Sequence, residues 1–169
     1  IKALVDSTKD YISQKYDYIL FSYHGLPERH IRKTDPTGQH CLKTKDCCQI
    51  ESQCHNTCYR AQAYRTTEEF VKKAKIPNDK YSVAFQSRLG RDKWLDPYTD
   101  QELVRLAKQG IKNILVICPA FVSDCLETLE EIAMQGEEIF TEAGGKKLTL
   151  IPCLNDSDNW IDVVANWCK

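Results

Sequence analysis

The sequence predicts an α/β fold, a three-layer Rossmann-like or flavodoxin-like domain built around a four-stranded parallel sheet. Four short apolar segments have the composition of buried strands, and segments with helical periodicity separate them along the chain. Strands that are joined by single helical crossovers form a right-handed parallel sheet with helices on both faces. With 169 residues, the chain is long enough for one domain with its own hydrophobic core.

Each predicted strand is an apolar run that ends at a polar or turn-forming residue. The four runs cover residues 16–23, 81–86, 113–118 and 148–152. Parallel α/β sheets bind ligands at the carboxyl ends of their strands, so a site is expected in the segments that follow the strands. Those segments contain His24, Gln86 to Trp94, Phe121 to Glu127, and Cys153 to Asn155.

Helical periodicity predicts five helices. They cover residues 1–12, 61–75, 100–110 and 124–140 and the segment from Trp160 to Trp167. Asp100 and Asp124 are predicted N-caps, and Glu127 has the spacing of a capping-box partner of Asp124. Residues 156–158 (Asp-Ser-Asp) supply the predicted cap of the last helix.

Charge and hydropathy exclude several classes of function. The formal net charge is −1, and the one cationic segment, residues 28–33, is short and mixed in charge, which argues against a nucleic-acid partner. The longest apolar run, residues 114–122, is interrupted by Pro119 and falls well short of the roughly 20 residues that a membrane-spanning helix needs. No glycine-rich phosphate loop follows a strand. The first residues contain neither Met nor a signal-peptide pattern, so we expect the chain to begin inside a longer protein.

Nine cysteines are many for a chain of this length, and five of them lie between residues 41 and 58. The five are Cys41, Cys47, Cys48, Cys54 and Cys58. Because they interrupt an α/β pattern typical of reduced cytoplasmic enzymes, metal or iron–sulfur ligation is favoured over disulfide formation.

His24 follows the first predicted strand and precedes Gly25, a position from which an imidazole can project into a crevice. A histidine that is only hydrogen-bonded within the turn explains the same residues equally well. Glu127 has a similar alternative, because a capping box accounts for a carboxylate at that spacing. The residues alone therefore leave both side chains open to a structural interpretation.

Three segments, taken in order, resemble the ferrochelatase family. Residues 22–27 (Ser-Tyr-His-Gly-Leu-Pro), followed by Asp35-Pro36, are similar to its histidine motif, residues 85–100 to its second block, and residues 118–132 to its third. The resemblance covers nearly the whole chain. It implies that residues 1–169 form the C-terminal domain, with a chelatase-like fold, of a ferrochelatase whose similar N-terminal domain is absent from this chain.

The resemblance also implies a reaction, the insertion of ferrous iron into a porphyrin in haem biosynthesis, with loss of two pyrrole protons. The porphyrin is protoporphyrin IX or coproporphyrin. His24 is then the proton acceptor or metal-site residue, Glu127 the metal-site carboxylate, and Glu131, on the same helical face, helps to pass iron or protons inward. The alternatives are a related cobalt or nickel chelatase and a non-catalytic iron–sulfur module. The isolated half is expected to be inactive.

The predicted porphyrin contacts are Ser22, Tyr23, Arg88, Trp94 and Phe121. The two aromatic residues after the strands can stack on the ring, although a role in the core is equally compatible with their positions. A guanidinium suits a propionate, but an exposed arginine without this role is the more common case. At Cys125 the sequence departs from many family members, which have a second histidine there, so proton handling depends more on Glu127.

The cysteine-rich segment, residues 40–60, resembles an insertion that binds a 2Fe–2S cluster in some bacterial ferrochelatases. Four thiolates suffice for such a cluster, so one of the five cysteines is spare, and the adjacent Cys47 and Cys48 are the ambiguous pair. A structural zinc site, in which His40 or His55 replaces one thiolate, remains an alternative.

The expected partners are a porphyrin and the protein's own N-terminal domain, while formation of a homodimer is left open. The lack of an extension after Lys169 favours a bacterial cytoplasmic enzyme, or one peripheral to the inner membrane, over an organellar one.

Overall fold

A computed structural model of the chain describes all 169 residues and contains one four-stranded sheet. The sheet is parallel throughout, with the strand order β2-β1-β3-β4. Its strands are β1 (Tyr18–His24), β2 (Tyr81–Gln86), β3 (Asn113–Ile117) and β4 (Lys147–Leu150). The predicted fold class is confirmed, because each predicted strand is present and every neighbouring pair runs in the same direction.

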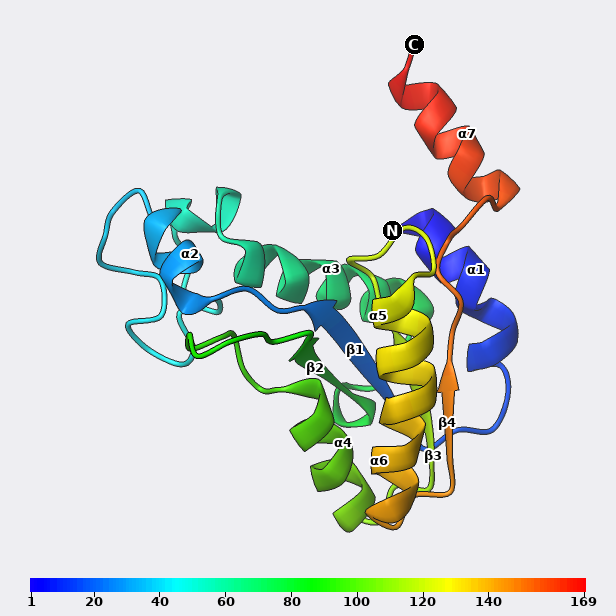
Figure 1. Cartoon of the computed structure of the whole chain (residues 1–169). Coiled ribbons are helices and arrows are strands. Elements are labelled where there is room, and N and C mark those ends of the chain that lie inside the picture. The colour runs from blue at the N-terminus through cyan, green and yellow to red at the C-terminus, as the bar shows by residue number, and fades with distance from the viewer.

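Helices cover both faces of the sheet (Figure 1). One face packs against α1 (Lys2–Ile12) and α3 (Tyr59–Ala74), and the other against α4 (Thr99–Lys108), the π-helix η3 (Leu129–Gly136) and α6 (Glu137–Glu142). Alternate residues of β1 enter the two cores, so that Phe21 contributes to the first core and Leu20 to the second. This three-layer arrangement explains why the strands are apolar on both sides.

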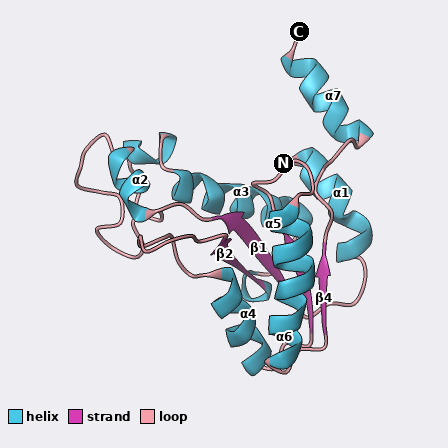
Figure 2. Cartoon of the chain, in the orientation of Figure 1, coloured by secondary structure: helices cyan, strands magenta, loops and turns pink.

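Other helices, apart from the last one, are short (Figure 2). They are α2 (Glu28–Lys33), η1 (Gln53–Asn56), η2 (Asn78–Lys80) and α5 (Leu126–Thr128). The helix α2 was not predicted. Two predicted caps are wrong: the N-cap of α4 is Tyr98 rather than Asp100, and that of α5 is Cys125 rather than Asp124.

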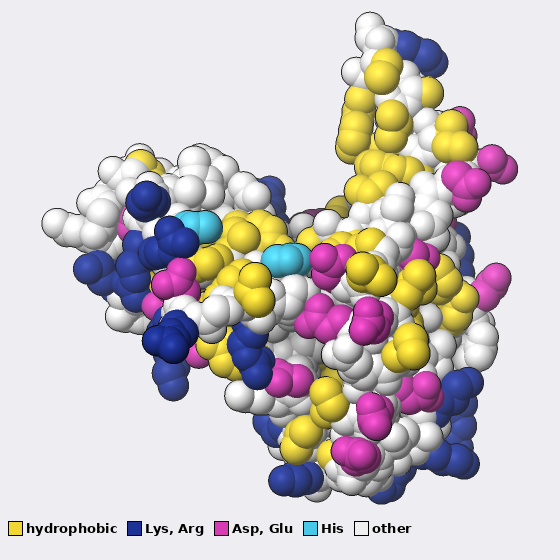
Figure 3. Space-filling model, viewed as in Figure 1, with side chains coloured by type: hydrophobic (Ala, Val, Ile, Leu, Met, Phe, Trp, Pro, Cys, Tyr) yellow, Lys and Arg dark blue, Asp and Glu magenta, His cyan; other side chains and the backbone are white.

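The last helix, α7 (Asp158–Trp167), extends away from the body of the molecule and buries none of its residues (Figure 1). Hydrophobic side chains lie along it in the space-filling view (Figure 3). Ile161, Val164 and Trp167 are exposed. None of the helices is both long and apolar enough to cross a membrane.

Gly25 allows the ends of β1 and β2 to approach each other closely. Its backbone N–H donates to the Gln86 carbonyl at 2.8 Å. A Cβ at this position would lie 2.8 Å from the same carbonyl oxygen and 3.2 Å from the Trp94 ring. Because any other residue would force these segments apart, the glycine holds the histidine turn against the segment that follows β2.

Candidate active site and cysteine nest

His24 is the last residue of β1, and its side chain is partly exposed. Its Nδ1 lies 2.6 Å from the Gly25 carbonyl oxygen. When Nδ1 carries the proton and donates to that carbonyl, Nε2 is left as the acceptor. The ring centroids of Trp94 and Phe121 lie 6.4 and 6.0 Å from that of His24, so two aromatic side chains flank the imidazole.

Glu127 lies in the first turn of α5, where Cys125 and Thr128 form a reciprocal capping box. The Cys125 thiol, the backbone N–H of Glu127 itself and the nearby His24 hold the pKa of the Glu127 carboxyl below its ordinary value. Cys125 is therefore both the N-cap of α5 and a partner of the carboxylate. Asp124, the predicted cap, instead accepts a hydrogen bond from Asn155 Nδ2 at 2.8 Å.

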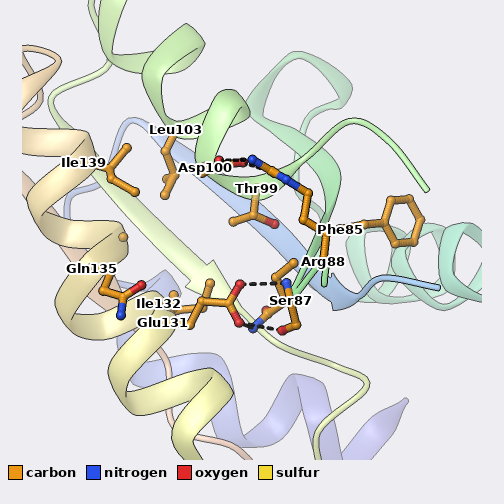
Figure 4. Close-up of a pocket in the computed structure, with 12 residues that line it drawn as sticks. Phe85, Ser87, Arg88, Thr99, Asp100, Leu103, Glu131, Ile132, Gln135 and Ile139 are labelled. Atoms are coloured by element: carbon orange, nitrogen blue, oxygen red, sulfur yellow. Dashed lines mark hydrogen bonds and ion pairs between the residues drawn. The ribbon is translucent and has the colours of Figure 1, made fainter. Parts of the chain in front are cut away.

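Glu131 is fixed by the segment that follows β2. Its Oε1 accepts the backbone N–H of Ser87 at 2.7 Å, and its Oε2 accepts from the Ser87 hydroxyl and the Gln86 amide (Figure 4). The carboxylate borders two cavities. One is an open groove of about 540 Å³ that His24, Glu127 and Glu131 line together, and the other is an inner pocket of about 250 Å³. Gln135 also borders both cavities. We call the first cavity the site groove.

Gln86 connects the sheet to the backbone of Glu127 and to the carboxylate of Glu131. It is 3% exposed, and its Oε1 accepts from the Ser22 hydroxyl at 2.7 Å. Its Nε2 donates to the Glu127 backbone carbonyl at 2.6 Å and to Glu131 Oε2 at 3.3 Å. Gln86 was predicted only as the start of a segment that follows a strand, and no specific role was assigned to it.

Two of the predicted porphyrin contacts lie in the core. Ser22 is fully buried and hydrogen-bonded to Gln86 and Thr99. Tyr23 is 3% exposed, its hydroxyl is paired with Thr67 at 2.8 Å, and burial raises its pKa well above the ordinary value. Neither side chain lines the site groove, so each supports the groove from beneath instead of contacting a ligand there.

Arg88 borders the groove, but its guanidinium is already engaged. It forms two hydrogen bonds of 2.7 Å with the Asp100 carboxylate (Figure 4). It also stacks on Tyr98, whose ring centroid lies 4.3 Å away. The sequence missed two apolar residues of the same groove, Leu89 and Leu126, which are 80% and 73% exposed. The only sequence signal was their position inside the second and third motif blocks.

The five clustered cysteines form a compact group beside the N-terminal end of α3, which we call the cysteine nest. All are free thiols, and only Cys48 is more than 2% exposed. The thiols of Cys41 and Cys54 lie within 4.8 Å of each other, and Cys58 is hydrogen-bonded to Cys41 and Cys48. Hydrogen bonds from the Cys48 thiol and from the first backbone N–H groups of α3 lower the pKa of Cys58 to about 5. Cys47 Sγ lies 3.9 Å from Cys48 Sγ.

Asp35 organises the loop that carries the nest. Its two carboxylate oxygens accept four backbone N–H groups at 2.8 to 3.1 Å, those of Thr37, Gly38, His40 and Cys41. These bonds hold its pKa far below the ordinary value, and they leave little capacity for a metal although Cys54 Sγ lies 3.1 Å away. The nearby imidazoles of His40 and His55 both point their Nε2 atoms at the Cys47 carbonyl, not at the sulfurs.

Together, these features define an α/β domain that places an imidazole and two carboxylates at the carboxyl edge of a parallel sheet, with a group of buried thiols beside them. The family model described as Ferrochelatase matches residues 1–169. The chain belongs to the ferrochelatase family.

Curated relatives agree with this assignment. A ferrochelatase of Pseudomonas fluorescens (strain SBW25) and one of Stutzerimonas stutzeri (strain A1501) are each 54% identical over 170 residues, with 100% of this chain and 50% of each relative covered. The chain thus spans about half the length of the curated relatives it matches. A solved structure described as a putative cobalamin biosynthesis CbiX protein from Marinobacter aquaeolei aligns with a TM-score of 0.48 and 13% identity, covering 89% of this chain and 92% of that one.

Proposed function

We propose that this chain is the metal-handling, C-terminal domain of a ferrochelatase, which inserts Fe²⁺ into protoporphyrin IX or coproporphyrin in haem biosynthesis. One observation carries the proposal: His24 and Glu127 line the same groove although 103 positions (127 − 24) separate them in the sequence. Family membership supports the same conclusion.

In this proposal the two side chains divide the proton and metal chemistry between them. The His24 imidazole accepts a pyrrole proton through Nε2, since an imidazole can take up a proton near pH 7. Glu127 stays ionised, because its pKa lies below the ordinary value, and so offers oxygen ligands to a ferrous ion as its water is removed. Trp94 and Phe121 are in position to hold the macrocycle beside the imidazole.

Glu131 extends the acidic side of the groove inward. Acidic side chains gather over the α5–α6 segment, next to hydrophobic side chains (Figure 3). Glu131 and Gln135 border both the site groove and the inner pocket. We propose that iron or protons pass along the side-chain oxygen atoms of these two residues. The hydrogen bond that Ser87 donates to Glu131 keeps the carboxylate in one orientation for that transfer.

A second domain completes the site in this proposal. The relatives are about twice as long as the chain, and the site groove is open on one side. The exposed apolar residues of α7 also need a covering surface, since large apolar groups rarely remain in water without a partner. We therefore expect the isolated chain to have no iron-insertion activity.

We further propose that the cysteine nest binds a 2Fe–2S cluster through Cys41, Cys48, Cys54 and Cys58. The thiols of these four residues are linked by short contacts through Cys41 and Cys58, while Cys47 contacts only Cys48 among the nest sulfurs. The thiol donors fit such a group, whereas both imidazoles are bonded elsewhere. When bound, the cluster would supply a one-electron redox couple.

The test of catalysis is His24→Ala in the full-length protein. We expect iron insertion to fall by about 10²–10⁴-fold, the contribution of a positioned acid or base, while porphyrin affinity is retained. His30→Ala is the matched control, because His30 is an exposed histidine of α2 outside the groove. Unchanged turnover in His24→Ala would refute the proposed role.

The test of the cluster is the visible spectrum and metal content of the anaerobically purified full-length protein. We expect a coloured protein that contains iron and acid-labile sulfide in equal amounts. A colourless protein with stoichiometric zinc would exclude the cluster and leave the catalytic proposal unaffected.

A further inference from the structure

Arg60 is a buried cation that has no carboxylate partner. It lies in the first turn of α3 and is 8% exposed. None of the ion pairs of the chain includes it. Its Nη1 and Nη2 donate to the Lys45 carbonyl at 3.2 Å, and its Nε is buried without any hydrogen-bond partner.

The guanidinium faces the cysteine nest. Nη1 lies 3.6 Å from Cys47 Sγ and 3.9 Å from Cys48 Sγ, while Tyr64 stacks on the group with its ring centroid 5.3 Å away. Neutral thiols are weak acceptors and cannot offset the loss of water around a full positive charge. Asp35, the carboxylate that organises the loop of the nest, already accepts four backbone N–H groups.

Other arginines of the chain show what this position lacks. Arg105 pairs with Glu102 at 2.7 Å and Arg88 with Asp100 at 2.7 Å, although both guanidinium groups are far more exposed than that of Arg60. A buried cation is retained in proteins where a negative charge compensates it. We therefore expect the negative charge that compensates Arg60 to lie on the sulfur atoms that the guanidinium contacts.

We infer that Arg60 is the counter-cation of an anionic, four-thiolate centre in the cysteine nest and that its charge raises the reduction potential of that centre. The inference rests on the proposed cluster. Four thiolates around a core of two ferric and two sulfide ions carry a net double negative charge, and uptake of one electron adds another. A nearby fixed positive charge stabilises the reduced form more than the oxidised form, so its removal lowers the potential.

The experiment is a redox titration of the full-length protein with dithionite, monitored by visible absorption and electron paramagnetic resonance. We compare Arg60→Gln, which removes the charge, with Arg60→Lys, which keeps it. The matched control is Arg65→Gln, which changes the net charge equally at an exposed position on the same helix. We expect Arg60→Gln to lower the reduced-to-oxidised ratio at a fixed potential by about tenfold, a shift of about 59 mV for one electron. Arg60→Lys and Arg65→Gln should stay near the wild type.

Each outcome decides the inference. An unchanged potential in Arg60→Gln, or an equal fall in Arg65→Gln, overturns it. If Arg60→Gln assembles no cluster while Arg60→Lys does, the centre requires a positive charge at this position, which supports the inference. If neither variant assembles a cluster, Arg60 is structural and the inference fails. A wild-type protein without iron and sulfide refutes the proposed cluster itself, which is a different result from any of these.

Discussion

The site groove and the cysteine nest offer metal ions two contrasting environments. The groove presents nitrogen and oxygen donors that are partly exposed, at the ends of strands and in the first turns of a helix. The nest presents sulfur donors that are almost all buried, on a loop that Asp35 holds together. An ion that must enter and leave needs the first environment, and a centre that must be retained needs the second. In the proposed function, one domain thus separates substrate metal from resident metal by donor type and by burial.

Serine substitutions in the nest have the largest expected effect and test which sulfurs form it. We expect Cys41→Ser, Cys54→Ser and Cys58→Ser in the full-length protein to lose the cluster absorption completely, because each removes a required thiolate. Cys47→Ser is the matched control, since it changes the one sulfur that we leave out of the ligand set. Iron and sulfide analysis measures the outcome. If Cys47→Ser loses the cluster and Cys48→Ser retains it, Cys47 is the ligand and Cys48 is the spare thiol.

Glu131→Gln tests whether the hydrogen bonds of the Glu131 carboxylate anchor the site groove. The substitution weakens the hydrogen bonds that the carboxylate accepts from Ser87 and Gln86, so we expect the free energy of unfolding to fall by about 1.5–3 kcal/mol. Chemical denaturation measures the change. Glu138→Gln, at an exposed position with no such bonds, should remain within about 0.5 kcal/mol of the wild type. Equal stabilities of the two variants would mean that Glu131 does not anchor the groove.

Cys125→Ala has the smallest expected effect and distinguishes this thiol from those of the nest. The Cys125 thiol is the main cause of the lowered pKa of Glu127, so its removal raises that pKa. Because the ionised carboxylate is the active form in the proposed mechanism, the acid limb of the kcat/KM profile of the full-length protein should move to higher pH. The control is Cys168→Ala, which changes an exposed cysteine. An acid limb that stays in place, or moves to lower pH, contradicts the contribution of the thiol.

The sheet was predictable from the sequence and much of the local geometry of the site was not. Burial on both faces requires apolar runs, so the predicted bounds of β2, residues 81–86, match the structure. The caps were mispredicted because cap spacing is a local pattern, whereas Asp100 pairs with Arg88 and Asp124 bonds to Asn155. Those partners come from other elements, and no local pattern contains them.

The buried residues beneath the site groove could not be predicted from the sequence for a related reason. Ser22 stands two positions before His24 in a strand that is buried on both faces, and the sequence does not distinguish a groove contact from a support. The π-helix η3 was also unforeseen, because hydrophobic periodicity was read at the ordinary helical repeat. What the motifs did identify were His24, Glu127 and Glu131, which line one groove.

One hydrogen bond joins the two environments that are otherwise so different. The Tyr59 hydroxyl donates to the backbone carbonyl of His24 at 2.8 Å, and Tyr59 directly follows Cys58. The first turn of one helix is therefore attached both to the sulfur loop and to the strand end that carries the imidazole. A displacement of this turn would move the support of the sulfur loop and of the imidazole together.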